Sequence, residues 1–423
     1  MAECFKLENG LRVINQYMPY SKSIAFGIFV KNGSRNESED LSGVSHFIEH
    51  MLFKGTEKRN QKDIAEDIDA TGGDINAYTA KEYTCYYTRV LDENIDSAME
   101  LLCDMFFNSV FDEKETEREK NIIYEEIGMY EDQPDDVAVD RLHCEIWKNS
   151  SLGKPILGTR ESVESISRDR LVEYFNKNYT AENTVLSFAG NIDRKKAEYY
   201  SSKYFGEWEN KKSRQYNTKA VYNPAIIEIE KNIEQVHLCM NFEGLNIWDE
   251  NRYALALLNA DVGGGISSRL FQAIREELGL VYSIYSYTSS YTDTGVFEIC
   301  AELSPLNIEK VIKSILFNLE KMKKDIISEK KLDKLKIQLK SNIILGQEGT
   351  GGTMSAMGRS FVLRNEYIEP QSLLTKIEGV KAEDINRLAN KIFDTESFSI
   401  SLAGQTKNTD INSIIKKYKS GKI

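Results

Sequence analysis

The pattern of hydrophobic and polar positions predicts strands and amphipathic helices along the whole chain. An Asn9-Gly10 turn between two short apolar runs indicates a β-hairpin. The run from Ile24 to Lys31 is typical of a buried strand. A stretch rich in Tyr, Thr and Val indicates a strand or hairpin over 75–90. Apolar residues at helical spacing predict helices over 60–70, 94–110 and 112–130, and a later run predicts a strand over 184–188.

A similar order of elements recurs beyond a polar, lysine-rich stretch over 206–222. The phrases TGGDINAYTAKEYT and ELGLVYSIYSYTSS occupy comparable places in the two halves. The second half is predicted to contain helices over 250–258 and 267–277, and strands over 226–230, 236–242, 281–288, 295–302 and 397–402. We therefore predict an α+β fold of two homologous domains, residues 1–212 and 213–423, each with a mixed or antiparallel sheet packed with helices.

The stretch GVSHFIEHMLFKGT near the N-terminus carries the candidate chemistry. Ser42 as N-cap and Gly55 just past the end predict about three turns of helix. At about 100° per residue, His46 and His50 fall on one face of this helix, with Glu49 beside them. Two imidazoles one turn apart can share a Zn²⁺ ion, and a neighbouring carboxylate can deprotonate water. The alternative is a half-buried helix with two chance histidines, but the chain has only four histidines.

A catalytic zinc needs a third protein ligand, because it takes three such ligands and keeps one open position. The predicted helix over 112–130 offers three glutamates, Glu119, Glu125 and Glu126. Glu119 and Glu126 share nearly the same helix face, whereas Glu125 is rotated away from it. The residues alone leave the choice among the three open.

Composition bounds the class of protein. A formal charge of −12 argues against nucleic acid as a partner, and an N-terminus without a basic segment and apolar core predicts no signal peptide. The apolar runs are too short for a membrane span. Six scattered cysteines, most of them in apolar stretches, predict reduced, buried thiols. We expect a soluble, cytoplasmic protein that binds neither nucleic acid nor membrane.

The spelling H-x-x-E-H, followed by a glutamate 76 positions after His50, resembles the pitrilysin/insulinase family of zinc metallopeptidases, the inverzincins. The resemblance is strongest to the mitochondrial-processing-peptidase-like branch, and it extends from ENGLRV through HFIEHMLFKGT and GGDINAYT into the second half. It implies that His46, His50 and Glu126 hold one Zn²⁺ per chain, that Glu49 is the general base and that Glu119 steadies the site. Glu125 is the fallback ligand.

The same resemblance implies residues that contact the substrate. Arg275 and Tyr282, within REELGLVY, stand at the spacing of a family pair that contacts substrate and tetrahedral intermediate. Both are suitable donors to a developing oxyanion, although a helix-end arginine and a strand tyrosine would look the same. Asn76, Ala77 and Tyr78 match the family's substrate strand, beside which an extended peptide adds.

The resemblance also implies an assembly and a reaction. A chain of this length is expected to form half of a clam-shell chamber, and two copies would close as a homodimer around an unfolded peptide. The predicted activity is endopeptidase cleavage of short unfolded peptides or leader segments. Two alternatives stay open: a non-catalytic peptide-binding or scaffold subunit of the same fold, and a catalytic subunit that needs a separate partner chain. His143 and His237 are predicted to be structural.

Overall fold

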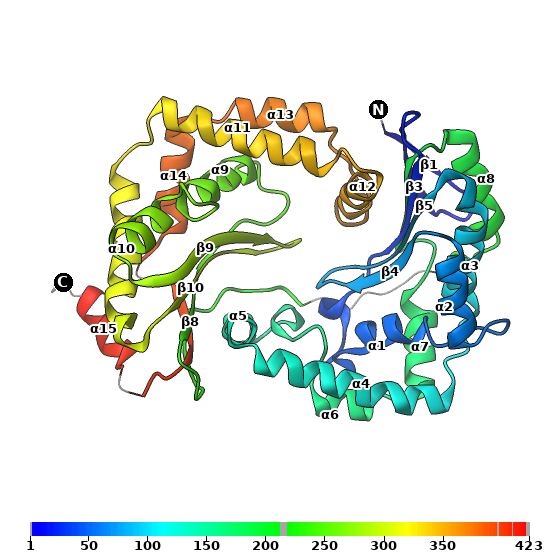
Figure 1. Ribbon diagram of the computed structural model, residues 1–423, viewed down its shortest axis with the longest axis horizontal. Helices are drawn as coiled ribbons and strands as arrows, with labels where there is room; N and C mark the ends of the chain where they lie inside the picture. The colour runs from blue at the N-terminus through cyan, green and yellow to red at the C-terminus, as the bar shows by residue number, and fades with distance from the viewer. Residues whose placement is uncertain (1, 212–217, 396, 408, 420–423) are drawn as a thin grey trace. The chain divides into compact units, whose positions relative to one another are not determined.

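The computed structural model describes residues 2–211, 218–395, 397–407 and 409–419 (Figure 1). The chain divides into two compact units, and each unit takes segments from both halves of the sequence. The first unit comprises residues 1–127, 154–218 and 343–370, and the second comprises 128–153, 219–342 and 371–423. The predicted boundary between residues 212 and 213 lies outside the described residues and stays a prediction.

The first unit contains a six-stranded sheet in the order β1-β2-β6-β3-β5-β4. Its β2 and β6 are parallel, and the other neighbours are antiparallel. The hairpin at Asn9-Gly10 is present, with Gly10 at φ 91°. The strands are β1 (Glu3–Lys6), β2 (Arg12–Tyr17), β3 (Ser23–Val30), β4 (Asp74–Thr79), β5 (Thr84–Leu91) and β6 (Thr184–Gly190).

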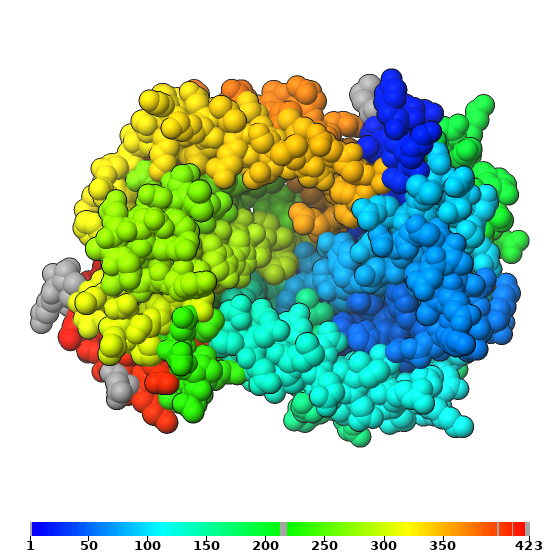
Figure 2. Space-filling view, viewed as in Figure 1, coloured from blue at the N-terminus to red at the C-terminus, as the bar shows by residue number. Residues whose placement is uncertain are grey.

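Helices cover both faces of this sheet. Alternation along β3 sends Phe26 and Ile28 into the larger core, and Ala25 and Phe29 to the face beneath α12. Figure 2 shows α2 and α3 (blue) at the surface of this unit. The helices are α1 (Val44–Met51), α2 (Gln61–Ala70), α3 (Ile95–Asn108), α6 (Arg160–Ser165), α7 (Arg168–Asn178), α8 (Arg194–Phe205) and α12 (Thr350–Arg364), with 3₁₀ turns at Ser34–Asn36, Glu39–Leu41 and Asp92–Asn94.

Glycines explain how α12 approaches the sheet so closely. A Cβ atom at Gly358 would lie 2.1 Å from the Phe29 ring, and one at Gly27 would lie 2.5 Å from Met354 Sδ. Only glycine leaves room for these contacts between helix and strand. The segment that contains Gly349 and Gly351 is therefore the start of a helix of the first unit, with Gly349 as its N-cap.

The second unit contains a five-stranded sheet in the order β7-β11-β8-β10-β9. Its β7 and β11 are parallel, as β2 and β6 are in the first unit. Reading β7, β11, β8, β10 and β9 against β2, β6, β3, β5 and β4 gives the same order and directions. The strands are β7 (Ile226–Glu230), β8 (Val236–Glu243), β9 (Val281–Ser290), β10 (Gly295–Leu303) and β11 (Ser399–Gly404).

The helices of the second unit pack on both faces of its sheet, and α5 covers the face that corresponds to the α12 face of the first unit. Two long helices, α4 (Glu113–Asp132) and α11 (Glu329–Gly346), run from one unit into the other. The remaining helices are α5 (Pro134–Ile146), α9 (Arg252–Val262), α10 (Ile308–Lys324), α13 (Pro370–Glu378), α14 (Ala382–Ile392) and α15 (Ile411–Lys419), with 3₁₀ turns at Ser151–Gly153 and Pro305–Asn307.

Two predicted helices of the second half differ from the structure. The helix expected over 250–258 begins and ends later, as α9. The helix expected over 267–277 is a π-helix at Phe271–Glu277. Side-chain periodicity does not distinguish i→i+4 from i→i+5 hydrogen bonds in so short a segment. The predicted α+β class with two similar units is confirmed.

Candidate metal centre

Helix α1 presents the two histidines, but it is shorter than predicted. It covers Val44–Met51, about two turns, and its N-cap is Gly43 rather than Ser42. Gly43 adopts φ 93°, and a Cβ atom there would lie 2.6 Å from Leu157 O. A glycine is needed at this position because the backbone is left-handed and closely packed. Ser42 therefore lies outside the helix.

Glu37 does the work expected of the N-cap side chain. Its Oε2 accepts the Gly43 N–H at 2.7 Å, and its Oε1 accepts the Ser45 N–H at 2.8 Å. Its side chain is 1% exposed. Burial raises the pKa of Glu37 to about 7, although the two backbone hydrogen bonds act in the opposite direction. This carboxyl group fixes the start of α1, and with it the position of His46, which directly follows Ser45.

The side chains of His46 and His50 converge with Glu126 of α4. Each imidazole Nε2 lies 3.6 Å from Glu126 Oε2, and one ligand atom from each residue lies within 4.8 Å of the others. Within the described parts of the chain, these three residues form the one such group of histidine, cysteine or carboxylate side chains. Figure 1 shows α1 between β4 and α4. Glu125, the alternative ligand, is exposed and is not in the group.

Glu119 orients the His50 ring from behind. Its Oε1 lies 2.8 Å from His50 Nδ1, and its Oε2 lies 2.7 Å from the Lys54 ammonium. Burial alone would raise the pKa of Glu119, but the contacts with His50 and Lys54 together lower it. An ionised Glu119 keeps the proton on His50 Nδ1, so that Nε2 faces Glu126 with its lone pair.

His46 is more deeply buried than His50. Burial, and next the neighbouring His50 ring, lower the pKa of His46 to about 3. The ring is thus neutral at pH 7 and offers a lone pair, as a metal ligand must. The two ring centroids are 4.4 Å apart.

The donor set fits a small divalent ion. Ligand atoms about 2.0–2.1 Å from a tetrahedral zinc ion lie roughly 3.4 Å apart. The two separations of 3.6 Å between imidazole and carboxylate atoms match that value, and they are too long for hydrogen bonds. Two imidazoles, one carboxylate and a second carboxylate behind one imidazole form a set typical of zinc.

Glu49 lies beside this group with its carboxylate held by a strand. Thr79 of β4 donates a hydrogen bond to Glu49 Oε2 at 2.5 Å. Burial raises the pKa of Glu49, while Thr79 and the charge of His50 act against that rise. The carboxylate is therefore fixed in direction and more basic than a free glutamate, which suits a proton acceptor.

The predicted substrate residues lie on β4, the last strand of the first sheet. Asn76 is exposed, whereas Ala77 and Tyr78 are partly buried. β4 pairs with β5 through one edge only. Because side chains alternate along a strand, Ala77 points to the same side as Thr79, toward α1.

Arg275 and Tyr282 belong to the second unit. Arg275 lies in the π-helical segment with its guanidinium 4.6 Å from the centroid of the Phe271 ring. Tyr282, on β9, is 70% exposed. Both side chains are thus accessible. Arg275 lies near the end of the π-helical segment, and Tyr282 lies on the terminal strand of the second sheet. His143 and His237, predicted to be structural, also belong to this unit, and His143 Nε2 lies 2.9 Å from buried Glu298.

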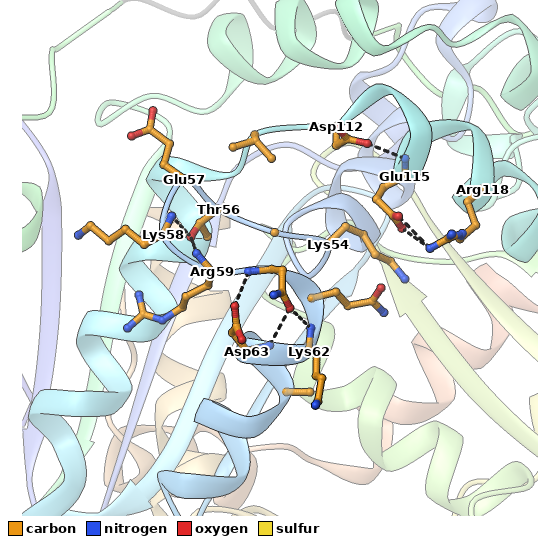
Figure 3. A pocket seen from close by; sticks show the side chains of 15 residues that line it. Lys54, Thr56, Glu57, Lys58, Arg59, Lys62, Asp63, Asp112, Glu115 and Arg118 are labelled. Carbon is orange, nitrogen blue, oxygen red and sulfur yellow. Dashed lines mark hydrogen bonds and ion pairs between the residues drawn. The ribbon is translucent and has the colours of Figure 1, made fainter.

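Lys54 also lines a solvent-open pocket of about 870 Å³ at the start of α2 (Figure 3). Several of its charged groups are already paired. Arg59 contacts Asp104 and two further acids, Arg118 binds Glu115, and Lys54 contacts Glu119. These ion pairs hold the cations that line the pocket.

Sequence reasoning missed Glu37, Lys54 and Thr79. Lys54 had a detectable signal, because it follows His50 by one helical turn. Thr79 directly follows the predicted substrate residues Asn76 to Tyr78 on the same strand. Glu37 had no local signal, since its contact with α1 depends on how the intervening loop folds back.

Comparison with known proteins identifies the family. Residues 12–160 match the family model described as Insulinase (Peptidase family M16), and residues 165–339 match Peptidase M16 inactive domain. The chain is 40% identical to an uncharacterized zinc protease, YmxG, of Bacillus subtilis, over 96% of this chain and 99% of that one. It is 39% identical to an uncharacterized zinc protease of Rickettsia felis, over 92% and 94% of the two chains. The chain therefore belongs to the M16 (insulinase) peptidase family.

Solved structures support the fold independently. A peptidase M16 inactive domain from Pseudomonas fluorescens superposes with a TM-score of 0.90 at 20% identity, over 96% of this chain and 98% of that one. A protease from Helicobacter pylori gives 0.89 at 22% identity, over 96% and 99%. The predicted family is confirmed, and the mitochondrial-processing-peptidase-like branch stays a prediction. None of the described helices is both long and apolar enough to cross a membrane.

Proposed function

We propose that the chain is a zinc-dependent endopeptidase that cleaves short unfolded peptides or leader segments. The observation that carries this proposal is the convergence of His46, His50 and Glu126 beside the buried carboxylate of Glu49. Membership of a peptidase family, and relatives that are named zinc proteases, support the same reaction and the same metal.

The chain's own residues would divide the chemistry among them. His46, His50 and Glu126 would hold a divalent ion, which would supply Lewis acidity that makes water more acidic and a peptide carbonyl more electrophilic. Glu49 accepts the proton of the attacking water and passes it to the leaving amine. Thr79 holds the Glu49 carboxylate in place, and Glu119 holds the His50 ring.

The substrate would bind as an added strand beside β4. This strand ends its sheet, so its outer main-chain groups can pair with an extended peptide. Such pairing reads little sequence, and it selects unfolded segments because a folded protein rarely offers a free strand. Asn76, Ala77 and Tyr78 are the residues that would contact the peptide.

The proposal includes a homodimer in which Arg275 and Tyr282 of one subunit complete the site of the other. Both are donors suited to the developing oxyanion, and both are accessible. Mixing a Glu49→Gln chain with an Arg275→Ala/Tyr282→Ala chain should restore part of the cleavage. Heterodimers that form without any recovered activity would contradict a site completed in trans.

The decisive experiment compares three proteins: wild type, Glu49→Gln and Glu125→Gln. Wild type should cleave a fluorogenic peptide and lose that activity to a chelator. Glu49→Gln should keep its metal, but its rate of peptide cleavage should fall by about 10²–10⁴-fold. Glu125→Gln is the matched control, since that neighbour on α4 is exposed, and it should retain full activity.

The alternative of a non-catalytic peptide-binding subunit rests on the match of residues 165–339 to the inactive domain of the family. It predicts that wild type binds peptide but cleaves it no faster than Glu49→Gln. That result, with metal bound in both proteins, would overturn the peptidase proposal.

A further inference from the structure

The second sheet carries two thiols face to face. Cys239 on β8 and Cys300 on β10 are direct partners in the antiparallel register. Such partners have Cα atoms about 4.5 or 5.5 Å apart, and disulfide-bonded cysteines span about 4.4–6.8 Å. Their side chains leave the sheet on the same side. The backbone already has the geometry that a disulfide needs.

The pair is buried but reachable by a small molecule. Cys239 is 1% exposed and Cys300 is 7% exposed. A cavity of about 90 Å³ is lined by both cysteines and has room for several molecules of the size of water. Its other walls come from the start of α5 and from three strands, and they comprise Asp135, Ala138, His237, Leu238, Ser283, Tyr285, Ala301 and Glu302.

The surroundings of Cys239 distinguish the two sulfurs. The Cys239 thiol donates to Asn241 Oδ1 at 3.1 Å, and Glu298 Oε1 lies 4.0 Å from the same sulfur. The neighbouring Cys300 side chain, and next burial, raise the pKa of Cys239, so Cys239 keeps its proton. Acceptors placed against a thiol favour its protonated form, whereas the thiolate is the nucleophilic form. Cys300 is thus the attacking sulfur and Cys239 the one that resolves.

The other four cysteines lie elsewhere in the described chain. Cys4 is exposed on β1, while Cys85 and Cys103 are buried in the first unit. Cys144 of α5 donates to Gly153 O at 3.0 Å, away from the sheet. In the registers of the described strands, Cys239 and Cys300 are the one cysteine pair.

We propose that Cys239 and Cys300 are a redox site that forms a reversible disulfide on reaction with a hydroperoxide. The Cys300 thiolate attacks one peroxide oxygen, the O–O bond breaks, and the leaving oxygen takes a proton to become water or an alcohol. The resulting sulfenic acid reacts with the Cys239 thiol, so the S–S bond forms and a second water leaves. The two cysteines lose two electrons and two protons, and the peroxide is reduced.

The test treats the full-length protein with hydrogen peroxide, blocks the remaining thiols under denaturing conditions and maps the peptides by mass spectrometry. We expect one cross-linked pair, Cys239 with Cys300, which dithiothreitol separates. A sulfenic-acid trap should label Cys300 in the Cys239→Ser variant. Cys4→Ser, a change at an exposed site, should cross-link like wild type.

Three outcomes would overturn the proposal. The first is wild type in which Cys4 is oxidised, while Cys239 and Cys300 are both recovered with the thiol-blocking label. The second is a sulfenic-acid trap that labels Cys239 in a Cys300→Ser variant as readily as Cys300 in Cys239→Ser. The third is cross-linking that dithiothreitol does not reverse. The main measurement uses wild type, so it does not depend on a variant that folds poorly.

Discussion

In the first unit, the sheet face beneath α12 is mainly apolar, with Ala25, Phe29 and Val185 packed against Met354 and Met357. In the second unit, α5 covers the corresponding face, and the residues there are largely polar. Several of them are fully or almost fully buried, namely Asn241, Glu298, Ser399, Ser401 and the thiols Cys239 and Cys300. Two sheets of one strand order thus differ in which face carries polar groups.

On the opposite face of each sheet, it is the first unit that carries the polar, metal-binding side chains. In the first unit, α1 brings two imidazoles against Glu126 on the helix-rich side of the sheet. In the second unit, the helix after the corresponding strand is α9, RYALALLNADV, which is mostly apolar and contains no histidine. Topology therefore does not set the chemistry of a unit. The side chains on each face, not the strand order, decide which face brings metal ligands together.

The largest expected effect is loss of the metal from the first unit. His46→Ala or His50→Ala removes one of three ligands, so metal bound per chain should fall from about one to near zero. The matched change in the second unit, His237→Ala, should leave the content at one. Elemental analysis after gel filtration measures this. Equal metal content in all of these proteins would contradict a centre confined to the first unit.

A slightly smaller effect is expected at the polar face of the second unit. His143→Leu removes the ring nitrogen that lies 2.9 Å from Glu298 Oε1, a carboxyl group that is 0% exposed. Removing one partner of such a buried hydrogen bond costs about 1–3 kcal/mol of the free energy of unfolding, and more where a group is charged. Replacing both residues, as His143→Leu/Glu298→Leu, should recover much of that loss. A double variant no more stable than the single one, in denaturant titrations, would argue against a pairing role.

The pH dependence of stability should report Glu37. Its pKa rises from 4.5 to about 7 on folding, so the folded state holds an extra proton between these values. The contribution of this group is complete below pH 4.5 and is lost as the pH rises through 7, by about 3 kcal/mol in all.

The control for this effect is Glu37→Gln, which cannot titrate. In the presence of a chelator, the difference between the free energies of unfolding of wild type and variant should change by about 3 kcal/mol between pH 4.5 and 7. Parallel curves would show that Glu37 is not protonated at the start of α1.

The smallest effects concern the support behind His50. Glu119→Gln should weaken metal binding by about 10–100-fold, because His50 loses the group that orients it. Lys54→Met should weaken it less, since Lys54 acts through Glu119. Arg118→Met changes a cation that pairs with Glu115 instead, and its affinity should equal that of wild type. Competition with a metal indicator measures the metal affinity of all three variants. A Glu119→Gln protein that binds metal as tightly as wild type would show that Glu119 does not support the site.

Local patterns in the sequence were sufficient for most elements of the fold. The predicted helices over 60–70, 94–110 and 112–130 correspond to α2, α3 and α4 within a few residues, because their periodicity is strong. The start of α1 was placed wrongly, because the need for glycine at position 43 arises from its contact with Leu157. The first half of the chain places α5 in the second unit, and the second half places α12 in the first, because of tertiary packing that no local pattern encodes.

The candidate site likewise contains residues that the sequence could name and residues that only the folded structure shows. The H-x-x-E-H pattern named His46 and His50, the family resemblance added Glu126, and the structure places the three together. Glu37 could not be named, since it reaches the start of α1 from a separate loop, and Thr79 was missed although it directly follows Asn76 to Tyr78. The pairing of Cys239 with Cys300 requires the register of β8 on β10, which two predicted strands do not specify.

The most direct test of the central claim is anomalous X-ray diffraction at the zinc absorption edge from crystals of the wild-type protein. The account predicts a single strong peak per chain, bounded by His46 Nε2, His50 Nε2 and a Glu126 carboxylate oxygen. A zinc-loaded crystal with its peak elsewhere, or with no peak between these three side chains, would contradict it.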